Sequence, residues 1–423
     1  MIETVREVVE DYREVKVSGV KRELKIPIPS LPKAIALIGP RRAGKTFYLL
    51  QMYKDLLSQG KPALYIPLDD DRLYPPNTKT LSTLLDLFHM EFGEKSGILL
   101  LDEIQEVNRW ELFVKRAVSM GFTVFISGSS SKLLSREVAT QLRGRGIHFE
   151  LFPFSFNEFI NAKGVEPGAS TKKRAAIKKT MEEYLLWGGF PEVALEENRL
   201  IKRKLLEEYL GVMLYRDIVE RHGVKNLRAL KLFIKLLTGS FAREISLSRT
   251  AKYMKGIGVD VSRNTLSDYL RYLQDAFFVF PLKKLGPIKE SEKSLPKIYI
   301  IDNGIITAST PRAKSELGRL MENLTYLHLR RLEKEVYYIK TPTWEVDFAV
   351  REGNGFNLIQ VSYTVEGPDT WKREVNGLIK ASKLVPTKST TVVTYDYEEE
   401  ETIEGQKIRF VPLWKFCRGE IKL

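Results

Sequence analysis

The stretch AIALIGPRRAGKTFYLLQMYKDLLSQG (34–60) decides the fold of the first part of the chain. It opens on an apolar run, as expected of a strand that is buried on both faces of a parallel sheet. Residues 39–46 then read GPRRAGKT and match the pattern G-x-x-x-x-G-K-[ST]. A helix-length segment follows and ends at Gly60, a residue type that tolerates the left-handed conformation of a helix terminus. Strand, glycine-rich turn and helix in this order predict a phosphate-binding loop.

This turn has the chemistry of a triphosphate site. Glycines let successive backbone N–H groups curl around phosphate oxygens, and the N-terminus of the following helix adds positive potential. Lys45 can reach the β- and γ-phosphates, and the Thr46 hydroxyl can ligate Mg²⁺. The sequence therefore predicts ATP and Mg²⁺ as ligands.

Further apolar runs alternate with helical patterns over the first 150 residues, which predicts a doubly wound α/β fold with a parallel sheet. One run, ILLLDE (98–103), delivers acids at a strand end, where ligands bind in open α/β sheets. Asp102 is expected in the Mg²⁺ shell, and Glu103 is expected to polarise the attacking water, as in a hydrolase. Ser127 and Ser129 follow the next run and can bond the γ-phosphate or the water, or simply form a serine-rich turn.

The predicted nucleotide site collects the turn and the strand-end residues. Its expected nucleotide-binding members are Gly39, Pro40, Arg41, Arg42, Ala43, Gly44, Lys45, Thr46 and Ser127. The expected metal ligands are Thr46 and Asp102, and the expected catalytic residues are Lys45, Glu103 and Arg145. Arg143 or Arg145 can stabilise transition-state charge, in cis or on a neighbouring subunit, or can belong to a solvated basic loop.

Composition narrows the class of protein. The 423 residues include 43% hydrophobic and 29% charged residues, the balance of a globular chain of several domains. A single cysteine, Cys417, excludes a disulfide framework, a cysteine-built zinc site and an iron–sulfur cluster. Because we find no run of about 18 apolar residues and no signal peptide at the start, we expect no membrane contact and a cytoplasmic location.

Five stretches in order resemble the archaeal ATPases of the AAA+ superfamily, which also occur in bacteria. They are GPRRAGKT, LLLDEIQEVNRWE, ISGSSSKLLSREVATQLRGRG, LFPFSFNEF and YLLWGGFPEV. The resemblance covers nearly the whole chain and favours Arg145 over Arg143 as the transition-state arginine. It implies a P-loop AAA+ core, a winged-helix module and a C-terminal domain similar to restriction-endonuclease-like PD-(D/E)xK folds. We place the core at 1–152, a helical lid at 153–220, the winged helix at 221–297 and the last domain at 298–423.

The middle of the chain is strongly basic. Residues 221–289 hold fourteen Lys and Arg and four acids, although the whole chain, with 67 basic and 54 acidic residues, has a net charge of only +13. A helix–turn–helix–strand pattern over 246–284 predicts a winged helix that binds DNA. Protein contact, a role as the AAA lid and a merely solubilising surface stay open as alternatives. The expected DNA-contacting residues are Arg249, Lys252, Lys255, Arg263, Asn264, Arg271, Lys283 and Lys284.

The C-terminal domain resembles a metal-dependent nuclease that has lost part of its site. Glu322 and Asp347 match the first two acids of that motif. Gln360 stands where a Glu is expected, and Ser362 stands where a Lys is expected. Gln lacks the charge of a good Mg²⁺ ligand, and Ser cannot supply a cation. Glu322, Asp347 and Gln360 form a second candidate metal site in a domain that is expected to be degenerate.

We therefore expect an ATP-hydrolysing AAA+ protein that binds DNA. One alternative is a nucleotide-dependent switch that signals to a protein partner, and another is an ATP-regulated nuclease. Assembly into a homo-oligomer stays open as well.

Overall fold

The chain folds into two compact units, Met1–Pro153 and Phe154–Leu423. A computed structural model describes residues 1–93, 96–128, 142, 144, 146–310, 314–365 and 367–421. Among the helices it describes, none is both long enough and apolar enough to cross a membrane. The predicted division of 153–423 into three domains stays a prediction.

The first unit is built on a five-stranded sheet in the order β2-β3-β4-β1-β5, in which every pair is parallel. The strands are β1 (Ala34–Ile38), β2 (Ala63–Pro67), β3 (Ile98–Asp102), β4 (Thr123–Ser127) and β5 (Gly146–Glu150). β1 to β4 are buried along their whole length, as their apolar runs predict. The predicted fold class, a mixed α/β protein with a parallel sheet, is confirmed.

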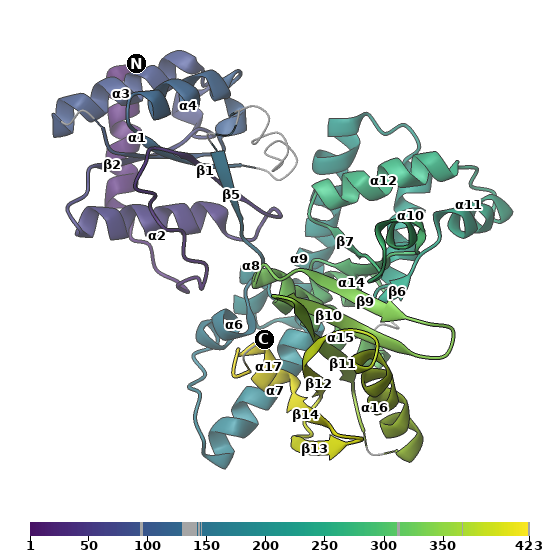
Figure 1. The fold of residues 1–423 in the computed structure, drawn as a ribbon. Helices are drawn as coiled ribbons and strands as arrows, with labels where there is room; N and C mark the ends of the chain where they lie inside the picture. The colour runs from purple at the N-terminus through teal and green to yellow at the C-terminus, as the bar shows by residue number, and fades with distance from the viewer. Residues whose placement is uncertain are drawn as a thin grey trace. The chain divides into compact units, whose positions relative to one another are not determined.

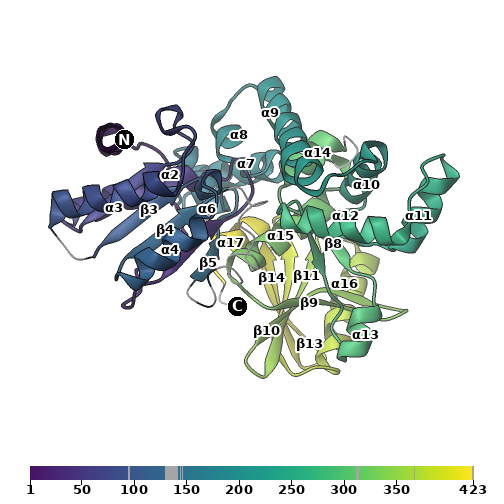
Figure 2. The same ribbon diagram turned by 90° about the horizontal axis from the view of Figure 1, so that it is seen from above.

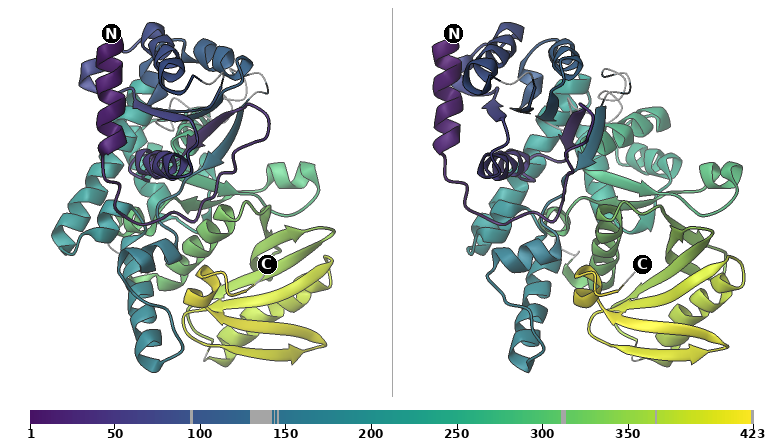
Figure 3. Two further views of the ribbon diagram at one scale, coloured as in Figure 1. Left: turned by 90° about the vertical axis from the view of Figure 1, so that its left-hand side faces the viewer. Right: turned by 60° about the vertical axis from the view of Figure 1, so that its left-hand side comes forward.

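Helices cover both faces of this sheet, with α2 on one face and α3 and α4 on the other (Figure 1). The helices and 3₁₀ turns are α1 (Ile2–Glu14), α2 (Lys45–Ser58), η1 (Asp71–Leu73), α3 (Thr78–Phe92), η2 (Ile104–Glu106) and α4 (Trp110–Ser119). Leu49 and Tyr53 of α2 pack in one core with Tyr65 of β2 and Phe125 of β4. α1 packs against β2 and α3 at the edge of the sheet (Figure 3). The C-terminal strand ends, where ligands bind in such sheets, are thereby held on a rigid base.

The second unit begins with a run of helices. They are α6 (Phe156–Ala162), α7 (Thr171–Trp187), α8 (Pro191–Leu195), α9 (Arg199–Val212), the π-helical η3 (Met213–Glu220) and α10 (Leu227–Gly239). Gly189, just after α7, meets a buried acid from later in the chain, Asp302. The backbone N–H groups of Gly189 and of Gly304 in α14 (Asn303–Ser309) donate to the two carboxylate oxygens of Asp302 at 2.7 and 2.8 Å. Burial raises the pKa of Asp302 to about 7, and these backbone N–H donors oppose the shift. The carboxylate joins two segments that lie far apart in the sequence.

A compact module follows, in the order helix, strand, helix, helix, strand, short helix, strand. After α10 come β6 (Arg243–Glu244), α11 (Leu247–Gly256), α12 (Arg263–Asp275), β7 (Val279–Leu282), α13 (Ile288–Lys293) and β8 (Lys297–Ile300). The three strands form an antiparallel sheet in the order β6-β8-β7. α11 and α12 pack side by side (Figure 2). Ser246 and Ser262 cap the two helices, since their hydroxyls accept from the backbone N–H groups of Arg249 and Thr265.

The chain ends in a six-stranded mixed sheet in the order β13-β14-β12-β11-β10-β9 (Figure 3). Its elements are α14 (Asn303–Ser309), α15 (Leu317–Arg331), β9 (Val336–Lys340), β10 (Glu345–Glu352), β11 (Gly355–Ser362), α16 (Pro368–Ser382), β12 (Thr387–Thr394), β13 (Glu399–Ile403), β14 (Gln406–Pro412) and α17 (Leu413–Cys417). α16 lies on one face of the sheet and α15 on the other (Figure 1). This packing brings α15 next to β11, which carries Gln360, and the ring of Tyr326 on α15 lies 6.3 Å from that of Phe348 on β10, the strand that carries Asp347.

Candidate nucleotide-binding site

The glycine-rich turn joins the end of β1 to the start of α2. Gly44, which precedes α2, has φ 92° and ψ 33°, a left-handed conformation that glycine adopts at little cost. Gly39 has no room for a side chain, because a Cβ there would lie 2.2 Å from the backbone oxygen of Leu151. The two glycines that the sequence motif fixes are therefore the two that this turn requires.

Lys45 is buried inside the turn that it follows. Its ammonium donates to the backbone oxygens of Gly39 at 3.0 Å and Pro40 at 2.9 Å. Only 7% of the residue is exposed. A phosphate seated on the turn would meet this ammonium at short range, since the charge is already held within the loop.

Arg22 is a residue of this site that the sequence motif does not reveal. It is buried, and its guanidinium donates to the backbone oxygen of Ala43 at 2.7 Å and to that of Phe152 at 2.5 Å. The two carbonyls belong to the glycine-rich turn and to the segment after β5. The planar fork of arginine thus holds the turn against the end of the sheet.

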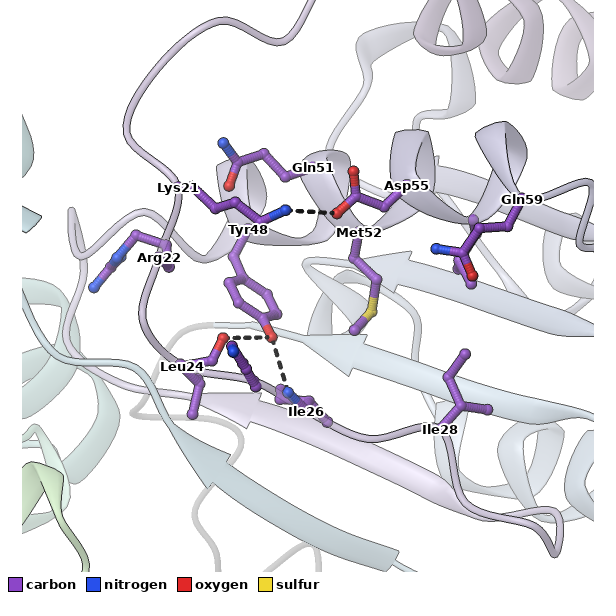
Figure 4. A pocket seen from close by; sticks show the side chains of 12 residues that line it. Lys21, Arg22, Leu24, Ile26, Ile28, Tyr48, Gln51, Met52, Asp55 and Gln59 are labelled. Atoms are coloured by element: carbon purple, nitrogen blue, oxygen red, sulfur yellow. Dashed lines mark hydrogen bonds and ion pairs between the residues drawn. The ribbon is translucent and has the colours of Figure 1, made fainter. Parts of the chain in front are cut away.

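Tyr48 holds the segment that carries Arg22. Figure 4 shows the Tyr48 hydroxyl pointing from α2 to that segment, where it donates to the Leu24 oxygen at 3.2 Å and accepts from the Ile26 N–H at 3.3 Å. Lys21 and Asp55 form an ion pair at 3.6 Å across the same groove, a cavity of about 240 Å³. The segment before β1 is therefore fixed on α2 at several points.

Replacement of Arg22 tests this arrangement. We expect Arg22→Ala to lower the free energy of unfolding by ~2 kcal/mol, because two buried carbonyls lose a charged donor. We expect nucleotide affinity to fall by about tenfold, because binding must then order a turn that is no longer held in place. Each ~1.4 kcal/mol of binding free energy spent in this way lowers the affinity by a factor of ten. Arg22→Lys keeps the charge but cannot donate to both carbonyls through a planar fork, so it should lie between wild type and Arg22→Ala. Urea unfolding and nucleotide titration measure both effects, and an Arg22→Ala variant that is as stable as wild type would contradict the assigned role.

Asp102 ends β3 and is the most heavily bonded acid of the site. Its carboxylate accepts from the hydroxyls of Ser127 and Tyr65, the latter at 3.0 Å, and from the Glu103 backbone N–H at 3.2 Å. Burial raises the pKa of Asp102, and the hydrogen bonds from Ser127 and Thr46 oppose the shift. Thr46 at the start of α2 therefore lies close to the strand-end acid.

Glu103 follows in a constrained backbone position. Its φ of 48° and ψ of 45° are left-handed, which is uncommon for a residue with a side chain and is concentrated at functional sites. Its carboxylate is half-buried and accepts from the Gln105 side-chain amide. Asp69, just after β2, is a third acid of this region, because burial and then the charges of Asp102 and Glu103 raise its pKa. Asp69 was not predicted from the sequence, although it follows the end of β2 closely, much as Glu103 follows β3.

The structure brings most of the predicted site together. The turn 39–46, Asp102, Glu103 and Ser127 meet at the C-terminal ends of β1, β3 and β4, which are neighbours in the sheet. Arg41 and Arg42 lie in the turn, and Arg42 has a left-handed φ of 65°. Ser129, Arg143 and Arg145 lie outside the described residues, so the choice of Arg145 stays a prediction.

Comparisons with known proteins place this site in a family. An uncharacterized protein of the archaeon Methanocaldococcus jannaschii, MJ1544, is 36% identical over 97% of this chain and 94% of its own length. The chain belongs to the family of MJ1544. An uncharacterized protein of the bacterium Haemophilus influenzae is 28% identical over 89% of this chain and 92% of its own length. The family therefore spans the whole chain, including both compact units.

Family models cover two parts of the chain. Residues 31–160 match an AAA domain, and residues 178–316 match a domain of unknown function, DUF8612. The first match holds the turn, Asp102 and Glu103, and it supports a nucleotide-binding ATPase domain of the AAA class. Solved structures align at low similarity: Cdc6p of Pyrobaculum aerophilum covers 75% of this chain and 93% of its own with a TM-score of 0.26, and DnaA of Aquifex aeolicus bound to AMPPCP covers 64% and 86% with a TM-score of 0.27. These scores are too low to bear on function.

In this family member, the predicted DNA-contacting residues lie outside the AAA domain, on α11, α12 and the segment after β7. Seven of them are exposed: Arg249, Lys252, Lys255, Arg263, Asn264, Arg271 and Lys283. Lys283 is paired with Glu292 at 2.5 Å, and Lys284 is half-buried beside Tyr338. Exposed Tyr253 adds an aromatic side chain between the cations of α11. The surface of α11 and α12 is therefore basic and accessible, whereas of the two lysines after β7 one is exposed but paired and the other is half-buried.

The predicted C-terminal residues also meet. The Gln360 side-chain oxygen accepts from the Asp347 backbone N–H at 3.1 Å, and Glu322 and Asp347 share a partner, the Lys297 ammonium, at 3.0 and 2.9 Å. The Ser362 hydroxyl donates to the Thr364 oxygen at 2.8 Å. In the described part of the chain, no group of three or more His, Cys, Asp or Glu is arranged to hold a metal ion. Lys297 was not predicted, since no motif marks it.

Proposed function

We propose that this protein binds ATP at the turn 39–46 and hydrolyses it with the acids at the end of β3. The observation that carries the proposal is that buried Asp102 at the end of β3 lies beside Thr46 at the start of α2, with Lys45 held in the turn next to them. A turn that presents N–H groups and a lysine suits a triphosphate, and a strand-end acid pair suits cleavage of its terminal bond.

We assign a separate role to each residue of the site. Lys45 neutralises phosphate charge, and Glu103 orients the attacking water. The Thr46 hydroxyl and the Asp102 carboxylate are the hard oxygen donors that Mg²⁺ prefers, so these two would hold the ion. Bound there, Mg²⁺ would supply charge neutralisation for the transferred phosphoryl group. The Ser127 and Tyr65 hydroxyls keep Asp102 oriented, since both donate to it.

A direct test measures nucleotide binding and phosphate release by the purified full chain. We expect the chain to bind a fluorescent ATP analogue, and unlabelled ATP should displace it. We also expect slow release of phosphate from ATP that depends on Mg²⁺. A chain that binds no nucleotide at millimolar concentration would refute the proposal.

We further propose that the surface of α11 and α12 binds DNA. The exposed cations on the two packed helices support this, together with the excess of fourteen basic over four acidic residues in 221–289. Apart from the short helix α13 between β7 and β8, the order helix, strand, helix, helix, strand, strand is that of a winged helix, whose second packed helix enters the major groove. Arg263 and Asn264 at the start of α12 are then the residues nearest the bases.

Salt dependence tests the DNA proposal. We expect affinity for duplex DNA to fall by about a thousandfold between roughly 50 and 200 mM salt if six phosphates are contacted. Lys252→Ala with Lys255→Ala should reduce the slope of log K against log salt by about 2, because two phosphate contacts are lost.

A control double variant removes two positive charges from a different surface of the protein. Lys172 and Lys179 are exposed on α7, and their double alanine variant should leave the slope unchanged. If log K for wild type does not change with log salt, or if the α11 and α7 double variants have equal slopes, a protein partner for this module is favoured instead.

A further inference from the structure

Lys297, the first residue of β8, is a buried lysine among three acids. Its ammonium lies 3.0 Å from Glu322 Oε1, 2.9 Å from Asp347 Oδ1 and 2.5 Å from Glu345 Oε1. Only 3% of Lys297 is exposed. Three carboxylates on α15 and β10 therefore converge on one nitrogen.

The hydrogen-bonding capacity of this nitrogen is filled. A lysine ammonium has three N–H donors, and three acceptors surround this one. The acids have further partners as well. The Tyr299 hydroxyl donates at 2.7 Å to Glu322 Oε1, the oxygen that Lys297 also contacts, and the Val361 N–H donates to Asp347 Oδ2 at 3.0 Å. The Lys340 ammonium lies 3.3 Å from Glu345 Oε2. The ammonium is a built part of the cluster.

Gln360 has no group left for a metal either. Its side-chain oxygen accepts from the Asp347 backbone N–H, and its amide lies beside the Glu374 carboxylate of α16, where it opposes the rise in the pKa of that acid. Of the three residues of the candidate metal site, two hold Lys297 and the third is held by the backbone of β10 and by α16.

The charges fix the ammonium in place. Burial by itself lowers the pKa of Lys297, but the charges of Asp347 and Glu322 more than offset this and raise it above its ordinary value. Burial and the charge of Asp347 raise the pKa of Glu322, while Lys297 lowers it. The lysine therefore stays charged, and the acids depend on it.

Divalent metals would need the same positions. Mg²⁺ and Mn²⁺ bind carboxylate oxygens at about 2.0–2.2 Å, and an ammonium cannot share that volume. The cluster faces a cavity of about 630 Å³ that is also lined by Lys340, Trp344 and Arg373, so a small ion could reach it.

We propose that the Lys297 ammonium is the resident cation of this pocket, standing where a divalent metal would sit, so that the native C-terminal unit binds no metal there. Removal of the amine would leave Glu322, Glu345 and Asp347 without a counter-charge and would create a site for a divalent cation. The pocket of this chain is then metal-independent, and its acids hold a side chain in place of an ion.

The test uses Mn²⁺, the full chain and no nucleotide. Free Mn²⁺ is measured by paramagnetic resonance during a titration. Wild type and Asp347→Asn should bind the same amount of Mn²⁺, because the native cluster holds none. Lys297→Met should be strongly destabilised, should bind one Mn²⁺, and should gain roughly 5 °C in melting temperature with saturating Mn²⁺. Adding Glu322→Gln and Asp347→Asn to Lys297→Met should abolish both responses.

Lys340→Met is the matched control. Lys340 also contacts Glu345, at 3.3 Å, but it is 38% exposed and touches neither Glu322 nor Asp347. It should gain no Mn²⁺ site. If Lys297→Met does not fold, the wild-type protein decides the question alone. The proposal is overturned if wild type binds one Mn²⁺ that is lost in Asp347→Asn, or cleaves DNA with Mn²⁺ in a way that is lost in Asp347→Ala. Absence of both supports the proposal.

Discussion

Lys45→Ala should weaken ATP binding by at least about a hundredfold, the cost of removing a preorganised cation from a phosphate site. Lys45 is buried in the turn and is bonded to the Gly39 and Pro40 oxygens, so its charge reaches a bound phosphate without prior reorganisation. Phosphate release should fall to the background rate, because the substrate no longer binds. Titration with a fluorescent ATP analogue and a steady-state phosphate assay measure the two effects.

Loss of binding must be separated from loss of folding. The two carbonyls that accept from Lys45 would lose a partner, which should cost about 1 kcal/mol of stability. Lys45→Met keeps the aliphatic stem and should show the same loss of binding with less destabilisation. Lys61→Ala, an exposed lysine just beyond α2, should leave both properties unchanged. A folded Lys45→Met variant that binds ATP as wild type does would remove the turn from the site.

The parallel sheet was predictable because its strands are short apolar runs with helical segments between them. This rule succeeds for β1 to β4, which are buried on both faces. It fits β5 less well, since β5 is an edge strand and Ile147 within it is 42% exposed. β6, two residues long, and the π-helical η3 carry no periodic pattern, so sequence periodicity could not reveal them.

The functional residues also differ in whether a local sequence pattern reveals them. Lys45, Thr46, Asp102 and Glu103 were predictable because each belongs to a local pattern in which a strand end or a helix start fixes the chemistry. Other residues act through partners far away in the sequence. Arg22 bonds Phe152, and Lys297 bonds Asp347 across fifty positions. No local pattern encodes such a pair, and only the packing of separate elements creates it.

Glu103→Gln should reduce ATP hydrolysis by at least about a hundredfold and leave ATP affinity within about twofold of wild type, the pattern of a group that acts on the water in the transition state. Gln has the shape of Glu and tolerates the same backbone, so the left-handed position at 103 should persist. Its amide oxygen can still accept from Gln105. The change therefore removes charge and basicity with little change of structure, and single-turnover phosphate release separates the chemical step from binding.

Two neighbouring acids make this prediction decisive. Glu106→Gln alters an exposed acid three residues further on and should hydrolyse ATP normally. Asp69 lies near enough for the charges of Asp102 and Glu103 to raise its pKa, so it is the other group that could orient the water. Asp69→Asn should then slow hydrolysis only mildly, by less than about tenfold, because Glu103 still activates the water. If Glu103→Gln hydrolyses normally and Asp69→Asn does not, the water is activated from the end of β2, and the role assigned to Glu103 passes to Asp69.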